Sequence, residues 1–295
     1  MKHVLVTGGS GQLGIELQRI PWPDGWKVEA TRTADLDLRD TAAIVAKVSE
    51  KPWAAVINAA AFTAVDAAEH DVAKAWAVNA LAPAAFAQAC AMAAIPLIQI
   101  STDYVFDGSK EGGWDEDDRP APLNVYGASK LGGELAVRTA CSRHAIIRTS
   151  WLVSAHGNNF VKTMLRLGLE RNEIGVVCDQ HGAPTAAADL AAAIARIAVS
   201  LVDDPQAPVG TFHFSNTGAT TWHGFAEAIF AGVAQRGKIS PRVVPITTRE
   251  YPTAAQRPSS SLLSHQAINA AFGIKPRSWQ KALHEILDEL IGVEP

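Results

Sequence analysis

The first half of the chain alternates short apolar runs with longer segments that are amphipathic or rich in alanine. Each apolar run has the length of a strand, and each intervening segment is long enough to form a crossover helix. Strands connected in this way are parallel, with right-handed crossovers. The pattern predicts an α/β fold, a doubly wound parallel sheet (Rossmann) with helices on both faces. The predicted strands are residues 4–7, 28–31, 54–58, 97–101 and 144–149.

The alternation stops after about residue 150, where stretches rich in glycine, proline and asparagine separate further helices. We therefore expect a second, smaller α/β lobe that binds substrate. An Ala-rich helix over about 185–202 is expected to pack back on the first lobe. The expected dinucleotide-binding domain is residues 1–150 plus about 179–205, and the substrate-binding domain is mainly 151–178 and 206–295. In the first half the predicted helices are residues 11–20, 40–50, 72–94 and 127–140.

Composition narrows the class of protein. Of the 295 residues, 48% are hydrophobic and 19% charged, which excludes a disordered, collagen-like or coiled-coil protein. The 26 basic and 30 acidic residues are scattered along the chain, so we expect no nucleic-acid partner. Three widely spaced cysteines, Cys90, Cys141 and Cys178, fit neither a disulfide framework nor a zinc cluster and favour a reducing compartment.

No targeting or membrane segment is expected either. The first apolar run is too short for a signal peptide. The apolar stretches at 84–100 and 186–202 are interrupted by polar or charged residues and are too short to span a membrane. These features predict a cytoplasmic protein that acts on a small molecule, as a monomer or homodimer.

The first predicted strand leads into a glycine-rich turn. Glycine permits the tight turn and brings the backbone close to a pyrophosphate, while the next helix directs its N–H groups at the phosphates. Glycine-rich turns are common, so a purely structural turn is the alternative. Here, however, the turn follows a strand and opens a helix, which favours dinucleotide binding. The turn reads Thr7-Gly8-Gly9-Ser10-Gly11-Gln12-Leu13-Gly14.

The end of the second predicted strand bears on the choice of cofactor. An acid there would hold the ribose hydroxyls of NAD, but the chain has Thr31 and then Arg32. The missing acid and the adjacent guanidinium favour a ribose 2′-phosphate, and therefore NADPH. In the alternative, Arg32 is a solvated surface residue and Asp35 binds the ribose, so that NADH is used.

A second set of residues has the chemistry of a proton donor. Tyr126 and Lys130 are four positions apart in a predicted helix, so phenol and ammonium lie on the same face. A neighbouring cation stabilises phenolate, and we expect it to lower the pKa of Tyr126. The alternative is an exposed helix pair without a role.

The nine histidines show no metal-binding spacing, and no metal site is expected.

The order of these motifs resembles that of the extended short-chain dehydrogenase/reductases. The shared segments are the glycine turn, NAAA at 58–61, STDYVF at 101–106 and NVYGASK at 124–130. Further segments resemble a group within that family that reduces a sugar nucleotide, and the resemblance runs from residue 4 to about 260. These segments are AFTAVD at 61–66, RTSW at 148–151, GNNFVKTM at 157–164, DQHGAPT at 179–185 and TWH at 221–223.

The resemblance implies an activity and a role for each matching residue. The activity is NAD(P)H-dependent reduction of the C4 ketone of dTDP-4-dehydro-6-deoxy-L-mannose to dTDP-L-rhamnose. Tyr126 would donate the proton, Lys130 would assist it and bind the nicotinamide ribose, and Thr102 would position the ketone. The expected substrate contacts are Thr102, Asp103, Tyr104, Trp151 and Asn159. With Arg32, the expected cofactor contacts are Gly8, Gly11, Gln12, Leu13, Gly14, Asp37, Leu38, Ala60, Ala61, Thr63, Tyr126 and Lys130.

The chain departs from the family pattern in two further places. Some members carry a magnesium-binding Glu where this chain has Ala188, and the remaining Glu16 alone makes a poor magnesium site. This argues against a dimer linked by metal. A polar residue is more usual between Ser261 and the following leucine, so contacts in that loop are left open.

Two other functions are compatible with the resemblance. One is a sugar-nucleotide epimerase or 4,6-dehydratase, although dehydratases place Asp-Glu after the Thr, where this chain has Asp103-Tyr104. The other is a non-catalytic regulatory subunit of a methionine adenosyltransferase. The presence of Thr102, Tyr126 and Lys130 argues against a pure binding protein, which has no chemical need for all three.

Overall fold

A six-stranded parallel sheet forms the centre of the protein in the computed structural model, which describes residues 1–292. The strand order is β10-β5-β4-β3-β1-β2, so the chain changes direction across the sheet between β1 and β3. Ligands of open α/β sheets bind beyond the carboxyl ends of strands at such a point. Five strands match the predicted ones, and the fold class is confirmed. The strands are β1 (Lys2–Thr7), β2 (Trp26–Ala30), β3 (Trp53–Asn58), β4 (Leu97–Thr102), β5 (His144–Thr149) and β10 (Gly210–His213).

The sixth strand, β10, was not predicted, because the sequence indicates turns over residues 210–218. The strand has only four residues, too few to establish a periodic pattern. It pairs with β5 along its whole length, and Phe212 lies opposite Ile147. Pairing with a distant strand decides the conformation of this segment.

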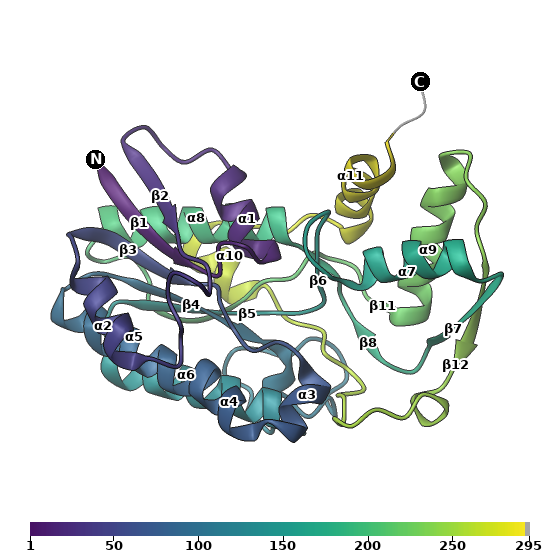
Figure 1. The fold of residues 1–295 in the computed structure, drawn as a ribbon, viewed down its shortest axis with the longest axis horizontal. Helices are drawn as coiled ribbons and strands as arrows, with labels where there is room; N and C mark the ends of the chain where they lie inside the picture. Colours follow the sequence, from purple (N-terminus) through teal and green to yellow (C-terminus); the bar gives the residue numbers. More distant parts are fainter. Residues whose placement is uncertain (293–295) are drawn as a thin grey trace.

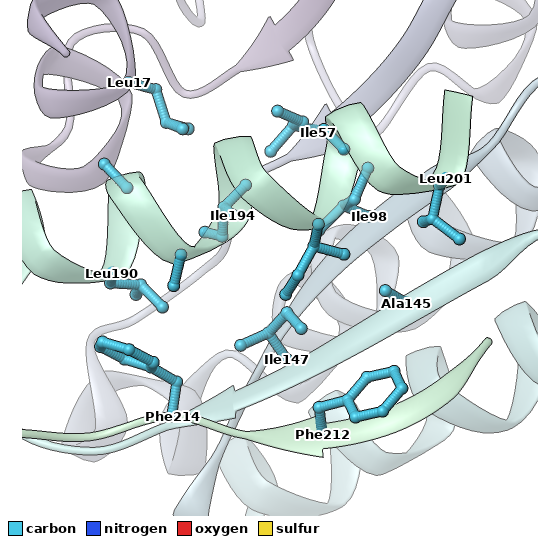
Figure 2. Packing of buried hydrophobic residues seen from close by; sticks show 14 of the residues in the cluster. Leu17, Ile57, Ile98, Ala145, Ile147, Leu190, Ile194, Leu201, Phe212 and Phe214 are labelled. Carbon is cyan, nitrogen blue, oxygen red and sulfur yellow. The ribbon is translucent and has the colours of Figure 1, made fainter. Parts of the chain in front are cut away.

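Three helices cover one face of the sheet (Figure 1). The side chains of Leu190 and Ile194 on α8 pack toward Ile57, Ile98 and Ile147 of the sheet, all fully buried (Figure 2). The same helix contacts α1, so a segment far along the chain completes this layer. The three helices are α1 (Gln12–Arg19), α8 (Ala187–Asp203) and α10 (Gln266–Phe272).

The opposite face is covered by a layer in which α5 packs between α2 and α6. The fully buried Phe86 of α5 belongs to the same cluster as Ile44 of α2 and Val137 of α6. The helix α6 begins after Asn124, whose side chain accepts a hydrogen bond from the backbone N–H of Gly127 at 2.8 Å. The helices are α2 (Thr41–Ser49), α5 (Ala82–Met92) and α6 (Val125–Ala140).

The run from Val72 to Met92 is divided where one helix was predicted. It consists of α4 (Val72–Trp76), a π-helical turn (Ala77–Leu81) and α5. Pro83, near the start of α5, has no N–H for a normal helical bond, which accounts for the local change of winding. By length and composition this run could cross a membrane, but 56% of the window is buried against the rest of the protein.

A separate group of elements follows β5 and has its own apolar cluster (Figure 1). In it β7 pairs with β12, and α9 packs against α7 and α11. Two short pairs, β6 with β9 and β8 with β11, connect this group to the sheet layers, because β9 directly precedes α8 and β11 follows β10. The main elements are α7 (Phe160–Glu170), β7 (Glu173–Val177), α9 (Trp222–Gln235), β12 (Arg242–Ile246) and α11 (Trp279–Ile291). The short strands are β6 (Leu152–Val153), β8 (His181–Gly182), β9 (Thr185–Ala186) and β11 (Thr220–Thr221).

Two short helices, α3 (Val65–His70) and a 3₁₀ turn (Asp103–Val105), lie close to the carboxyl ends of the strands and contact α6. A further 3₁₀ turn (Thr248–Glu250) follows β12. The sheet therefore presents its strand ends, and not its faces, to the second group of elements.

Candidate active site

A cavity of about 650 Å³ lies at the carboxyl ends of β1, β3, β4 and β5. One wall comes from the strand ends and from α6, and the other from residues after β5 and from the start of α9. A substrate cavity between a sheet edge and a second group of elements is a common site for small ligands. The cavity brings together most of the predicted site residues, including Gly11, Thr102, Tyr126, Lys130 and Trp151.

The glycine turn has the geometry of a pyrophosphate site. Gly8 has φ of +71°, and a Cβ there would lie 3.0 Å from the Ala60 backbone. A Cβ on Gly14 would lie 2.1 Å from the Gly8 carbonyl oxygen. Glycine is therefore required at both positions. The helix α1 begins at Gln12, directly after Gly11, so its free N–H groups point toward the cavity mouth and suit a dinucleotide phosphate.

A second cavity of about 300 Å³ continues from Gly8 toward the end of β2. Arg32, Asp37, Arg39 and Lys74 line it. Asp35 instead accepts a hydrogen bond from the backbone N–H of Arg32 at 2.9 Å and does not line this cavity. The basic side chains suit a 2′-phosphate. Arg39 and Lys74 were missed in the sequence because neither belongs to the turn motif.

Within this cavity, the carboxylate of Asp37 forms an ion pair with the guanidinium of Arg39. Arg39 Nη2 donates to Asp37 Oδ2 at 2.6 Å, and Nε donates to both carboxylate oxygens. These hydrogen bonds lower the pKa of Asp37 to about 2. The negative charge of Asp37, which would repel a phosphate, is therefore offset by the positive charge of Arg39.

Of the remaining predicted cofactor contacts, Gly8, Gly11, Gln12, Leu13 and Gly14 all line the larger cavity. Leu38 lines the smaller cavity, and Ala60 and Ala61 line both. Thr63 lines the larger one. Asn79 was not predicted, yet its side chain bonds both the backbone N–H and the carbonyl of Phe62, and so supports the loop after β3.

The predicted proton donor Tyr126 and its partner Lys130 both line the larger cavity, where Lys130 is buried and Tyr126 is half-buried. Tyr126 and Lys130 come from the first two turns of α6, and Thr102 ends β4. Lys130 Nζ donates to the carbonyl of Ile100 at 2.6 Å. A Cβ on Gly127 would lie 2.1 Å from the Tyr104 carbonyl oxygen, so the absence of a side chain lets α6 approach the end of β4 closely.

The pKa of Tyr126 differs from the prediction. Burial raises the pKa of Tyr126 to about 12 and lowers that of Lys130 to about 8. The lowering of the Tyr126 pKa expected from the sequence is therefore wrong for this structure. Spacing places the two groups on one face, but the loss of water around both dominates their ionisation.

Asp103 is also deeply buried beside these residues. Burial raises its pKa to about 6. Its Oδ1 accepts a hydrogen bond from the Thr102 hydroxyl at 2.9 Å, whereas Oδ2 has no hydrogen-bond partner within residues 1–292. Tyr104 packs edge-on against Tyr126, with ring centroids 5.8 Å apart. The surroundings of Asp103 therefore favour the neutral carboxyl more than water does.

An aromatic wall faces the strand ends. Trp151 stacks on Trp222 with ring centroids 3.6 Å apart and an interplanar angle of 9°, and Phe160 lies next to Trp222. Trp151 has φ of +45°, which is strained for a residue with a side chain. A Cβ on Gly182 would lie 2.5 Å from the Trp151 ring, so glycine makes room for this ring.

Asn159 does not lie where the sequence places it. Its side chain accepts from the backbone N–H of Lys162 at the start of α7 and donates to Gln12 at 2.9 Å. The cavity is lined instead by its neighbours Asn158 and Phe160, together with Trp222. Those residues were missed as contacts, although the segments that contain them had been singled out. Only the folded chain shows which of two adjacent asparagines faces the cavity.

The surroundings of Glu16 do not fit magnesium. Its carboxylate lies 3.7 Å from Arg19 and 3.5 Å from His156, which are basic groups. Burial raises the Glu16 pKa, which weakens it as a metal ligand. Within residues 1–292 no group of three acidic, histidine or cysteine side chains is placed to hold a metal.

Comparison with known proteins places this geometry in a family. The family model described as the RmlD substrate binding domain matches residues 1–291. The dTDP-4-dehydrorhamnose reductase of Aggregatibacter actinomycetemcomitans is 40% identical over 289 residues, covering 97% of this chain and 98% of the relative. That of Burkholderia thailandensis is 42% identical over 297 residues, covering 98% and 99%. The crystal structure of dTDP-4-dehydrorhamnose reductase from Bacillus anthracis in complex with NADP has a TM-score of 0.91 and 38% identity, covering 98% and 100%.

Proposed function

The chain belongs to the RmlD family of dTDP-4-dehydrorhamnose reductases, and from this premise we propose how its cavity carries out the reaction. The protein reduces the C4 ketone of dTDP-4-dehydro-6-deoxy-L-mannose with NADPH or NADH. The product is dTDP-L-rhamnose, and the reaction is the last step of dTDP-rhamnose biosynthesis. The relative crystallised with NADP supports a nicotinamide cofactor.

Tyr126 donates the proton. Bound NADPH supplies the hydride to C4, and the negative charge that develops on the ketone oxygen needs a proton from the protein. With its pKa raised to about 12, Tyr126 holds its proton at neutral pH and donates it only as negative charge develops on the ketone oxygen, with the ammonium of Lys130 stabilising the phenolate that forms. The buried setting strengthens its hydrogen bond to the developing oxyanion.

Lys130 stabilises the phenolate left after proton transfer. It lies one helical turn beyond Tyr126 and donates to the carbonyl of Ile100. An ammonium has three donors, so this bond leaves donors for the phenolate and the nicotinamide ribose.

Thr102 positions the ketone. Its hydroxyl donates to Asp103 in this structure and turns toward the ketone when substrate binds.

The sugar nucleotide occupies the side of the cavity away from the glycine turn. Trp151 and Trp222 offer flat apolar surfaces to the deoxysugar or base, and Tyr104 and Asp103 complete the sugar pocket. We assign Asn158, rather than Asn159, to this pocket because it lines the cavity. Restricting the sugar between these walls and the cofactor brings C4 and the hydride together.

The chain divides into two functional parts under this proposal. Residues 1–150 together with about 179–205 hold the dinucleotide, and residues 151–178 and 206–295 mainly hold the sugar nucleotide. Two segments of the later part, β10 and α10, extend the dinucleotide-binding part because they pack on its sheet. We further propose a cytoplasmic enzyme, since the buried Cys90 and Cys141 are free thiols. Its oligomeric state, monomer or homodimer, is to be measured by light scattering.

The shared cavity of Thr102, Tyr126 and Lys130 beside the glycine turn is the observation that carries this function. The test is to mix the purified protein with NADPH or NADH and enzymatically generated dTDP-4-dehydro-L-rhamnose. We expect the absorbance of reduced nicotinamide to disappear and dTDP-L-rhamnose to form, identified by nuclear magnetic resonance.

The same experiment separates the alternatives. Retained cofactor that is not consumed, with an altered sugar nucleotide, would indicate an epimerase or dehydratase. Cofactor binding without any turnover, together with a stable complex with a methionine adenosyltransferase, would indicate a regulatory subunit. Tyr126→Phe serves as the control, because it removes the proton donor and leaves the cofactor contacts of the glycine turn in place.

A further inference from the structure

Directly behind the cavity lies a buried ion pair that the proposed mechanism does not use. Arg148 of β5 and Glu134 of α6 both have fully buried side chains. Arg148 Nε donates to Glu134 Oε1 at 2.8 Å, and Nη2 donates to Oε2 at 2.7 Å. Placing both charges out of water is costly, and their mutual attraction often does no more than offset that cost. Stability therefore does not account for the pair by itself.

The carboxylate of Glu134 also bonds the strand that ends at the catalytic threonine. Ser101 Oγ donates to Glu134 Oε1 at 2.6 Å. One helical turn earlier, Lys130 donates to the carbonyl of Ile100 at 2.6 Å. Successive turns of α6 are thus bonded to successive residues of β4, and the next residue of the strand is Thr102.

Arg148, on the neighbouring strand β5, binds the same carboxylate of Glu134 that Ser101 bonds. Arg148 lies opposite Ser101 in the pairing of β5 with β4. With two bonds from Arg148 and one from Ser101, the carboxylate is fixed in position and direction. Arg138 adds a second cation at 2.9 Å, but its side chain is 34% exposed and bonds neither β4 nor β5 through this contact.

We propose that Glu134 is a positioning residue for the reaction: through Ser101 it fixes the end of β4, and therefore Thr102, relative to Tyr126 and Lys130 on α6. Thr102 and Tyr126 come from different elements, and both act on one ketone oxygen. Misplacement of such groups by about 1 Å lowers turnover by up to about a hundredfold. The proposal rests on the proposed function, since it names a partner of the same reaction.

The most selective test is Ser101→Ala, which removes the connection to β4 and leaves the Glu134–Arg148 pair intact. We expect kcat to fall about tenfold to a hundredfold, while KM for both substrates and Kd for NADPH stay within about twofold. Arg138→Gln is the matched control, because it removes a partner of the same carboxylate on its exposed side. Its kcat should stay within about twofold of that of the unmodified protein.

A second variant removes both buried charges together. Glu134→Gln with Arg148→Met leaves no unpaired charge in the interior, so folding is retained more readily than with either change alone. We expect the same selective loss of kcat. The proposal is overturned if folded Ser101→Ala and the double variant both keep kcat within about twofold of the unmodified protein, or if KM rises in proportion.

Hydrogen exchange separates failure of this proposal from failure of the proposed function, because it requires no turnover. We expect the backbone amides of residues 97–104 to exchange faster in Ser101→Ala than in the unmodified protein or Arg138→Gln. Unchanged exchange would overturn the positioning role. If the unmodified protein does not reduce the sugar nucleotide but exchange responds as expected, the proposed function fails and the connection stands.

Discussion

The two ends of the cofactor and substrate cleft contain aspartates in opposite electrostatic environments. Asp37, at the adenosine end, is partly exposed and is held by Arg39, so its pKa is lowered to about 2. Asp103, at the catalytic end, is buried and has no ion-pair partner among residues 1–292, and its pKa is raised to about 6. An aspartate is therefore permanently charged at the adenosine end, whereas the carboxyl of the aspartate at the catalytic end titrates close to neutral pH.

This contrast extends to the neighbouring residues. The adenosine end is lined by charged, solvent-exposed side chains, which bind a phosphate mainly through charge and tolerate some disorder. At the catalytic end Thr102, Asp103 and Lys130 are buried, so each proton and hydrogen bond there has a larger effect on energy. We therefore expect changes at the catalytic end to alter turnover or folding strongly, and changes at the adenosine end to alter mainly cofactor choice, with smaller effects on stability.

The largest expected effect is that of Tyr126→Phe at the catalytic end. Without the phenolic proton the developing oxyanion is not neutralised, and kcat should fall about a thousandfold. Steady-state turnover measures the loss, and NADPH fluorescence titration should show that the cofactor still binds, because the contacts of the glycine turn remain. Normal turnover in this variant would remove Tyr126 from the mechanism and with it the distinction between the two ends.

The next largest effect is expected on stability, from Asp103→Asn. The folded-state pKa of about 6 is above the ordinary 3.8, so ionisation of Asp103 disfavours folding as pH rises through this interval. At pH 7 the variant should be more stable by up to about 3 kcal/mol. The gain should be mostly lost by about pH 4, near the ordinary pKa of the carboxyl, because Asp103 is then neutral in the folded protein and partly neutral in the unfolded chain.

Urea unfolding monitored by circular dichroism at these two pH values measures the difference. Asp37→Asn at the adenosine end is the matched control, and its stability should change with pH in the opposite sense. Asp37 has a lowered pKa, so its charge favours the folded state above the ordinary pKa. An Asp103→Asn variant that is less stable at pH 7 than at pH 4, relative to the unmodified protein, would contradict the assigned burial effect.

A smaller effect, graded with pH, is expected from Lys130. Stabilising the Tyr126 phenolate requires the ammonium form, and burial lowers the Lys130 pKa to about 8. The value of kcat/KM should therefore decline above about pH 8, by about tenfold per pH unit, because it reports ionisation of the free enzyme. A pH profile that stays flat to about pH 10 would show that Lys130 remains charged throughout.

The smallest effect is expected at the adenosine end, from Arg32→Ala. Losing one charge-assisted bond to a 2′-phosphate should raise KM for NADPH about tenfold and leave KM for NADH within about twofold. Arg39→Gln is the companion variant, since it frees Asp37 to face the ribose. It should shift preference toward NADH without changing the thermal midpoint. Equal effects on both cofactors would assign Arg32 to the solvated surface.

Sequence alone accounts for much of the fold and for part of the site. Alternating apolar runs predicted five of the six strands, because a strand buried on both faces must be apolar along its length. The glycine turn was predicted from its spacing, since only glycine tolerates the approach of Gly14 to the backbone of Gly8. The pair Tyr126 and Lys130 was predicted because helical spacing places both on one face.

Other features depend on segments that meet only in the folded protein. The stack of Trp151 on Trp222 joins residues from separate parts of the chain, and Asn158 rather than Asn159 faces the cavity. Arg39 and Lys74 reach the adenosine cavity from different elements. The spacing of residues within one segment does not predict these contacts, because they depend on how distant elements pack.

The sequence by itself determined most of the elements, the glycine turn and the placement of Tyr126 and Lys130 on one helix face, because local backbone sterics and helical periodicity act within a few residues. Only the tertiary structure decided the ionisation of the site. Burial raises the pKa of Tyr126 and lowers that of Lys130, which reverses the expectation drawn from their spacing. The reason is that desolvation depends on everything packed around a group, and most of those neighbours are distant in sequence.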